Sequence, residues 1–175
     1  MKWSGTAAAL LLLVSSSLLA QGERTPSDVV DAFHKALRNL DTAGALSLLD
    51  RGLVVFEFGL VDAKVDAYGL RHMPHDMDLA RETSWKLETR RTGGEGNDRW
   101  VLSTYRVTGK TVDSVPIDHT TLETVILRRS GAGFRIVHLH WSSSDNSFQE
   151  KMQRLRAEEL KMQRQQAEEL APAAR

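Results

Sequence analysis

The chain has 175 residues, balances 23 basic against 23 acidic residues, and contains no cysteine. The absence of cysteine excludes disulfide bonds, thiol catalysis and thiolate metal sites. The balanced charge argues against a nucleic-acid partner, because phosphate binding draws on a concentrated basic surface.

Residues 1–22 have the pattern of a secretory signal peptide. Lys2 precedes an uncharged stretch from Ala7 to Ala20, and a small-x-small site follows at residues 20–22. We predict cleavage after Gly22, with cleavage after Ala20 as the alternative, and a periplasmic or secreted product. The apolar run is short and interrupted by serines, so an uncleaved membrane anchor is the rival interpretation. After cleavage no membrane span is expected.

The first part of the mature chain predicts three helices and one strand. Residues 25–40 place apolar side chains on one helical face, with Thr25 as the N-cap. Asp41 caps a second, short helix with Leu49 on its inner side. Residues 53–58 (LVVFEF) predict a strand, and residues 62–73 predict a third helix that Pro74 should close.

The apolar period then changes from 3.6 to 2, which predicts strands separated by turn residues. Helices followed by strands indicate an α+β domain with N-terminal helices packed on a curved, mainly antiparallel sheet. We assign this domain to residues 23–147. The predicted strands cover residues 82–91, 98–110, 115–129 and 134–143.

Residues 148–175 form a charged C-terminal tail in which a ten-residue unit repeats. KMQRLRAEEL at 151–160 recurs as KMQRQQAEEL at 161–170, and both copies are rich in helix-forming residues. A heptad register would put Glu159 and Gln166 in the seam, which argues against a coiled coil. The tail is predicted to be a solvated helix, or alternatively a helix that binds a partner.

Several segments give the chain a family resemblance over about residues 25–145. The segments are PSDVVDAFHKALRNLDTAGALSLLD, FEFG, AYGLRHMPHDM, ETVILRR and RIVHLHWSSS. They resemble the SnoaL-like branch of the nuclear transport factor 2-like (ketosteroid isomerase-like) superfamily. The resemblance implies a cone in which a curved sheet and the first helix enclose a pocket, and in which many members dimerise. Such folds host isomerases, cyclases, dehydratases and non-catalytic members, and the aspartate signature of the steroid isomerases does not map cleanly here.

Three residues are candidates for catalysis: Glu57, His138 and His140. Glu57 stands in an apolar strand, where an inward carboxylate would have a raised pKa, although alternation equally permits an outward, solvated side chain. His138 and His140 lie two apart, so their side chains share one face of a strand. That face either lines the pocket or is turned away from the core, which leaves the histidines solvated.

His72, Tyr68 and Tyr105 are candidates for ligand binding. His72 and Tyr68 share a face of the predicted third helix, and Tyr105 lies on a central strand. We expect no cofactor and no metal. The weaker alternative is a divalent ion held by His72, His138 and His140.

Three hypotheses on function follow. The first is an exported domain that binds a small ligand in an internal pocket. The second is an acid/base enzyme of isomerase or dehydratase type that uses Glu57 or the pair His138 and His140. The third is an interaction module that forms a homodimer.

Overall fold

The computed structural model describes residues 23–111, 113–131 and 133–170, so the predicted signal peptide lies outside the described residues. Along the chain, two helices come before the first two strands, two more helices come before the last four strands, and a long helix follows the last strand. The elements in chain order are α1 (Pro26–Arg38), α2 (Thr42–Ser47), β1 (Leu49–Glu57), β2 (Leu60–Ala63), α3 (Val65–Arg71), α4 (Met73–Glu82), β3 (Thr83–Gly93), β4 (Asp98–Lys110), β5 (Pro116–Ser130), β6 (Gly133–Asp145) and α5 (Asn146–Leu170).

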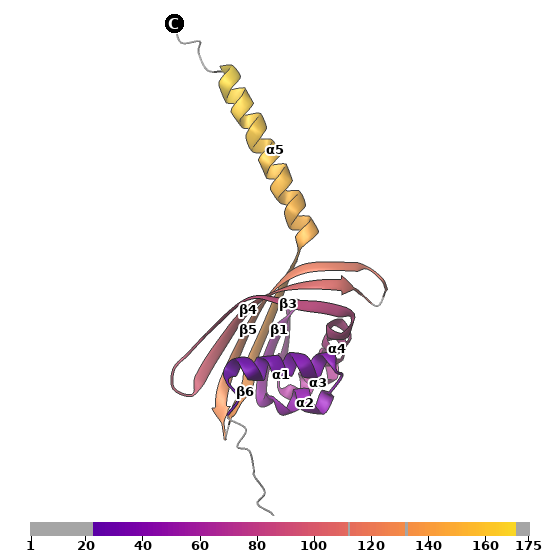
Figure 1. Ribbon diagram of the computed structural model, residues 1–175, viewed down its shortest axis with the longest axis vertical. Coiled ribbons are helices and arrows are strands. Elements are labelled where there is room, and N and C mark those ends of the chain that lie inside the picture. Colours follow the sequence, from indigo (N-terminus) through magenta and orange to yellow (C-terminus); the bar gives the residue numbers. More distant parts are fainter. Residues whose placement is uncertain (1–22, 112, 132, 171–175) are drawn as a thin grey trace, which may run out of the picture.

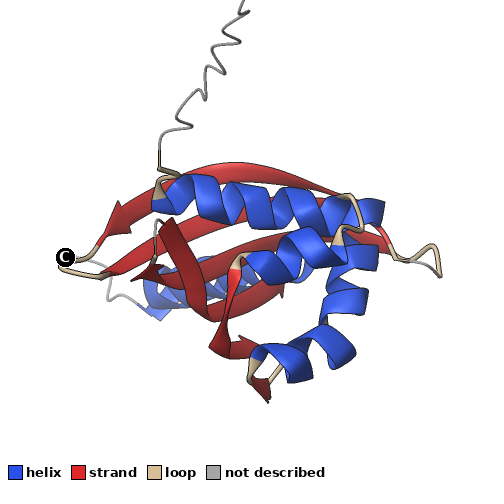
Figure 2. Cartoon of the chain, turned by 90° about the horizontal axis from the view of Figure 1, so that it is seen from below, coloured by secondary structure: helices blue, strands red, loops and turns tan. Residues whose placement is uncertain are grey.

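The strands form one sheet in the order β2-β1-β6-β5-β4-β3. All neighbouring pairs are antiparallel except β1 and β6, which run parallel. Helices α1 to α4 lie on one face of the curved sheet (Figure 2). The predicted α+β class, with a mainly antiparallel sheet and N-terminal helices, is confirmed.

Helix α1 has the capping box that its sequence predicts. Asp28 accepts a hydrogen bond from the Thr25 backbone at 2.9 Å, and the Thr25 hydroxyl accepts one from the Asp28 backbone at 3.2 Å. The apolar side of α1 packs on the inner face of the sheet, where each fully buried side chain contributes about 1.5–3 kcal/mol. The fully buried members of this core include Val30, Phe33, Leu53, Val125, Leu127, Ile136 and Leu139.

The segment between β1 and β3 differs from the prediction. The helix expected over residues 62–73 is present over the shorter range 65–71 (α3), because residues 60–63 form the short strand β2, and a second helix, α4, was not expected. Pro74 lies in the first turn of α4, which begins at Met73, since a proline is tolerated where the N–H group has no intrahelical partner. The expected place of Leu49 on the second helix is also wrong, because α2 ends at Ser47 and Leu49 begins β1.

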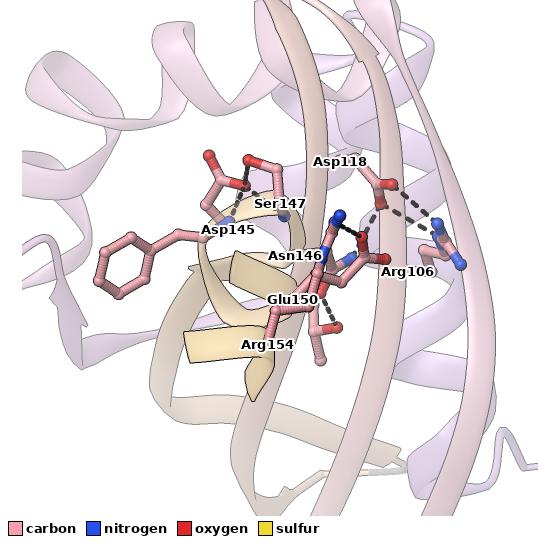
Figure 3. Close-up of polar contacts among 9 residues, drawn as sticks. Arg106, Asp118, Asp145, Asn146, Ser147, Glu150 and Arg154 are labelled. Atoms are coloured by element: carbon pink, nitrogen blue, oxygen red, sulfur yellow. Dashed lines mark hydrogen bonds and ion pairs between the residues drawn. The ribbon is translucent and has the colours of Figure 1, made fainter. Parts of the chain in front are cut away.

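Helix α5 extends away from the domain and begins directly after β6 (Figure 1). The Asp145 carboxylate accepts hydrogen bonds from the backbone N–H groups of Ser147 and Phe148, at 2.8 and 3.3 Å. Asn146 donates to Asp118 at 2.8 Å and so ties the first turn to β5 (Figure 3). Within the described residues, no helix is long and apolar enough to cross a membrane.

Candidate functional site

Glu57 is the last residue of β1 and points to the core side of the sheet. It is only 7% exposed, and its Oε2 atom receives no hydrogen bond from the described residues. Alternation along β1 places Leu53 and Val55 on the same inner side, whereas Phe56 points outward. Of the two orientations that the sequence left open for Glu57, the structure therefore has the inward one.

The Glu57 carboxyl lies close to the carboxyl of Asp76, which α4 supplies. Burial, followed by the negative charge of Asp76, raises the pKa of Glu57 to about 8. Burial raises the pKa of Asp76 to about 6, against the opposing effect of hydrogen bonds from Tyr68 and Glu57. Two carboxylates cannot donate to each other, so the raised pKa values of both groups indicate that the pair shares one proton near neutral pH.

Tyr68 contacts this pair, whereas His72 contacts a different carboxylate. The buried Tyr68 hydroxyl donates a hydrogen bond to Asp76 Oδ2 at 2.6 Å. His72 contacts the buried carboxylate of Asp62, which also pairs with Arg71. These two of the three residues expected to bind ligand thus contact carboxylates of the protein itself.

A groove of about 420 Å³ lies at the C-terminal end of β1, and Glu57 is one of its lining residues. It forms because the parallel pairing of β1 with β6 ends at Phe56 and His140, after which the two strands diverge. The turn at Phe58 and Gly59, both with positive φ (49° and 75°), carries the chain away into β2. We call this feature the β1–β6 groove; its lining residues are Phe56, Glu57, Phe58, Gly59, Leu60, Val61, His140, Trp141, Ser142 and Ser143.

A second polar cluster lies on the inner face around Glu123 of β5. Glu123 Oε2 lies 2.6 Å from His34 Nε2 and accepts a hydrogen bond from Trp141 Nε1 at 2.8 Å. Tyr105 donates to Glu123 Oε1 at 3.3 Å and accepts from Arg90 at 2.7 Å. Although burial opposes it, the positive charge and hydrogen bond of His34 hold the pKa of Glu123 below its ordinary value.

The interior between the two clusters is nearly filled. Glu57, Trp141, His34 and Trp85 surround a cavity of only about 10 Å³, about the room that one water molecule needs. Between these two clusters, the described residues therefore leave no spacious pocket. The β1–β6 groove, which shares Glu57 and Trp141 with the cavity, is a larger space that is open to a ligand.

His138 and His140 lie on the opposite side of the sheet from this cluster. Leu139 and Trp141 fill the core side, so the histidines point outward, beside the ring of Phe56 at 5.0 and 6.1 Å between centroids. They do not share a site with His72, and among the described residues no group of three or more His, Asp or Glu side chains is placed to hold a metal ion. The outward orientation was the alternative that strand alternation had left open.

Two of the residues that build the site were not identified from the sequence as functional candidates. Asp76 was missed because α4 was not predicted. His34 was missed because it lies on a helix expected only to pack, although its spacing from Val30 and Leu37 places it on the inner face of α1. Glu57 alone carried a clear signal, as a carboxylate within an apolar strand.

No protein-family model matches the sequence, and no curated protein is significantly similar to it. Solved structures share the fold. A candidate ketosteroid isomerase from Shewanella frigidimarina has a TM-score of 0.62 at 26% identity and covers 66% of this chain and 92% of its own. A nuclear transport factor 2-like protein of unknown function from Pseudomonas putida has a TM-score of 0.56 at 20% identity, over 66% of this chain and 82% of its own.

A third structure is a candidate calcium/calmodulin-dependent protein kinase II association domain from Xanthomonas campestris. Its TM-score is 0.60 at 15% identity, and the alignment covers 83% of this chain and 99% of that one. The three structures are similar in fold to this chain, but their names differ in what they say of these proteins. The chain has a nuclear transport factor 2-like fold, which fits the superfamily that the resemblance in the sequence predicted.

Proposed function

We propose that the domain binds a small, partly apolar molecule in the β1–β6 groove, with Glu57 as the polar anchor. The observation that carries the proposal is Glu57, a residue that lines the groove and whose buried Oε2 atom receives no hydrogen bond from the described residues. A polar atom buried without a donor costs folding free energy of about 1–3 kcal/mol. Such a cost is typical of a functional site, because a ligand can supply the missing hydrogen bond.

The rest of the groove suits an apolar body. Phe56, Phe58, Leu60 and Val61 expose large hydrocarbon surfaces beside Glu57; Phe58 alone is 76% exposed. A groove of about 420 Å³ falls within the usual range for small-molecule sites, about 300–1,000 Å³. The groove therefore combines apolar walls with one polar anchor.

The test is to block the groove and look for a retained molecule by native mass spectrometry. Ser142 lines the groove, so Ser142→Trp should expel a ligand that the wild-type protein carries when it is purified from its native compartment. Ser84→Trp is the matched control, because Ser84 is exposed on β3 and does not line the groove. A molecule retained equally by all three proteins, or by none of them, would contradict the proposal.

Acid/base catalysis is a second candidate, and one observation favours it. The environments of Glu57 and Glu123 move their pKa values in opposite directions, one raised to about 8 and the other lowered. Such separation is typical of an acid and a base assigned to different roles. If Glu57 transfers a proton in the reaction, Glu57→Gln should abolish turnover while the affinity for the substrate is retained. Turnover that persists in this variant would exclude the role.

Self-association is the third candidate, and the outer sheet face supports it. Phe56, Leu102 and Leu122 are 42%, 39% and 55% exposed there, next to the outward His138 and His140. One neighbour in fold is described as an association domain. Sedimentation equilibrium should find a homodimer in the wild-type protein and a monomer in Leu122→Glu. Leu70→Glu, on the exposed side of α3, is the control that should leave the dimer intact.

Export to the periplasm or the exterior is also proposed, from the signal pattern of residues 1–22. Intact-mass measurement of the protein recovered from its native cells tests this. A chain that begins at Glu23 agrees with cleavage after Gly22, and one that begins at Gln21 agrees with the alternative site. A chain that retains residue 1 would contradict cleavage.

A further inference from the structure

A recess between α1 and β3 is lined by more positive than negative charge. Its volume is about 180 Å³, and its lining includes Arg38 and Arg90 but only one carboxylate, that of Asp31. His34 also lines the recess, but its ring lies 2.6 Å from the buried Glu123 carboxylate, which offsets any charge that it carries. The recess shares no lining residue with the β1–β6 groove. Its net charge therefore suits a monoanion.

Arg90 places a largely buried guanidinium group on the wall of this recess. Its side chain is only 13% exposed, and it donates hydrogen bonds to Asp31 at 2.8 Å, to Ser103 at 3.2 Å and to Tyr105 at 2.7 Å. A guanidinium group has five N–H donors, and buried donors normally have partners. Two N–H groups of Arg90, one on each terminal nitrogen, have no partner among the described residues. They remain for an acceptor that enters the recess.

Arg38 brings a second positive charge to the same recess. Asp31, His34 and Arg38 follow one another at intervals of three and four residues, so they share one face of α1. Asp31 pairs with Arg90, whereas no carboxylate of the described residues forms an ion pair with Arg38. A negative group in the recess would therefore meet one arginine that the described residues leave unpaired.

Aromatic and aliphatic side chains form the rest of the wall. Trp85 and Leu87 come from β3 and Tyr105 from β4, and Leu87 is 43% exposed although its side chain is apolar. The volume of about 180 Å³ is smaller than the range of about 300–1,000 Å³ that is usual for ligand pockets. The recess therefore has room only for a small molecule, one with an apolar part beside its negative group.

We propose that this recess binds a small organic carboxylate, which pairs with Arg38 and Arg90 through its carboxylate group and packs its apolar part against Trp85 and Leu87. Arginine suits this role, because its planar guanidinium group matches the geometry of a carboxylate and stays charged at neutral pH. A phosphate monoester carries about 1.5–2 negative charges at pH 7, which exceeds the net charge of the wall and would increase repulsion from Asp31. No bond of the ligand breaks, so the step is binding alone.

Titrations of the nitrogen-15-labelled protein, followed by nuclear magnetic resonance, test the proposal with three probes: benzoate, benzyl alcohol and acetate. The signal to follow is the indole N–H group of Trp85, assigned by its loss in Trp85→Phe. Benzoate should bind at least about tenfold more tightly than benzyl alcohol, because hydrogen bonds to a charged group are stronger than neutral ones. It should also bind at least about tenfold more tightly than acetate, which has no ring to bury.

Two variants of the recess and one matched control show where benzoate binds. Arg38→Gln removes the unpaired charge, and Arg90→Lys keeps a charge but loses the planar group, so each should raise the Kd for benzoate by about fivefold or more. Lys35→Gln also removes a positive charge from α1, but Lys35 does not line the recess, so its Kd should stay within about twofold of the wild-type value.

Equal affinity for benzoate and benzyl alcohol, a Kd for benzoate that neither arginine variant changes, or no binding of benzoate would overturn the proposal. An equal loss of affinity in Lys35→Gln would do the same, because it would indicate a general effect of charge. Ser142→Trp, which blocks the β1–β6 groove, should leave benzoate binding unchanged. Loss of benzoate binding in that variant would place the ligand in the groove and also overturn the proposal.

Discussion

Replacing Glu57 by glutamine should stabilise the protein at alkaline pH and leave it nearly unchanged at acidic pH. Glutamine has the shape of a protonated glutamate, and its amide can donate to Asp76 as the shared proton does. The wild-type carboxyl has a pKa raised from 4.5 to about 8 in the folded protein. The folded state therefore binds the proton more tightly than the unfolded state, and wild-type stability falls as the pH rises from 4.5 to about 8.

The size of this effect follows from the pKa of Glu57. At about 1.4 kcal/mol per pH unit, a rise from 4.5 to about 8 gives a ceiling of about 5 kcal/mol. Asp76 shares the proton, and local rearrangement relieves part of the cost of a buried charge, so a gain of about 2 kcal/mol or more is expected at pH 8. At pH 4.5 the difference between the two proteins should be less than about 0.5 kcal/mol.

Urea unfolding of both proteins at pH 4.5, 6, 7 and 8 measures the difference in free energy of unfolding. The two curves of stability against pH should diverge as the pH rises, with Glu57→Gln the more stable protein. Parallel curves, or a variant that is less stable by the same amount at every pH, would refute the assignment of a buried, protonated Glu57.

Three further predictions concern other parts of the fold. His34→Ala leaves the buried Glu123 carboxylate without its charge partner and should cost about 3 kcal/mol in urea unfolding at pH 7, so a loss under about 1 kcal/mol would contradict the pairing. Gly109→Ala should lower the free energy of unfolding by about 2 kcal/mol or more, because φ is 154° at this residue and an added Cβ would lie 2.6 Å from a backbone carbonyl oxygen. Gly133→Ala is the control: open space surrounds Gly133, so this variant should be nearly as stable as the wild-type protein in the same assay. Truncation after Gln149 should change the free energy of unfolding by less than about 0.5 kcal/mol, because the α5 side chains at residues 150–166 are exposed, and a larger loss would indicate that the tail packs on the domain.

The predictable part of the fold is the part in which local patterns agree with burial. The capping box of Thr25 and the apolar face behind it defined α1, and the change to a period of 2 located β3 to β6. Strand β2 was missed because it has only four residues, one of which is the charged Asp62. Asp62 is buried and contacts its partners Arg71 and His72, of which Arg71 lies on the following helix, α3, and His72 is the C-cap of that helix.

The site was also only partly predictable, because it depends on tertiary contacts that local sequence patterns do not show. Glu57 was visible as one charge within an apolar strand, but its pairing with Asp76 is a tertiary contact between β1 and α4. For β6, alternation showed that His138 and His140 share a face. Burial of Leu139 and Trp141 on the other face then decided which side meets the core, because apolar side chains gain more from burial than imidazoles do.

The protonation state of Glu57 is the central claim of this account, and its pKa can be measured directly. Nuclear magnetic resonance of protein labelled with carbon-13 at the glutamate side-chain carboxyls, with Glu57→Gln to assign the signal, follows this group through a pH titration. The account predicts one carboxyl that titrates near pH 8, absent from the variant. A Glu57 signal that titrates near the ordinary value of 4.5 would contradict it.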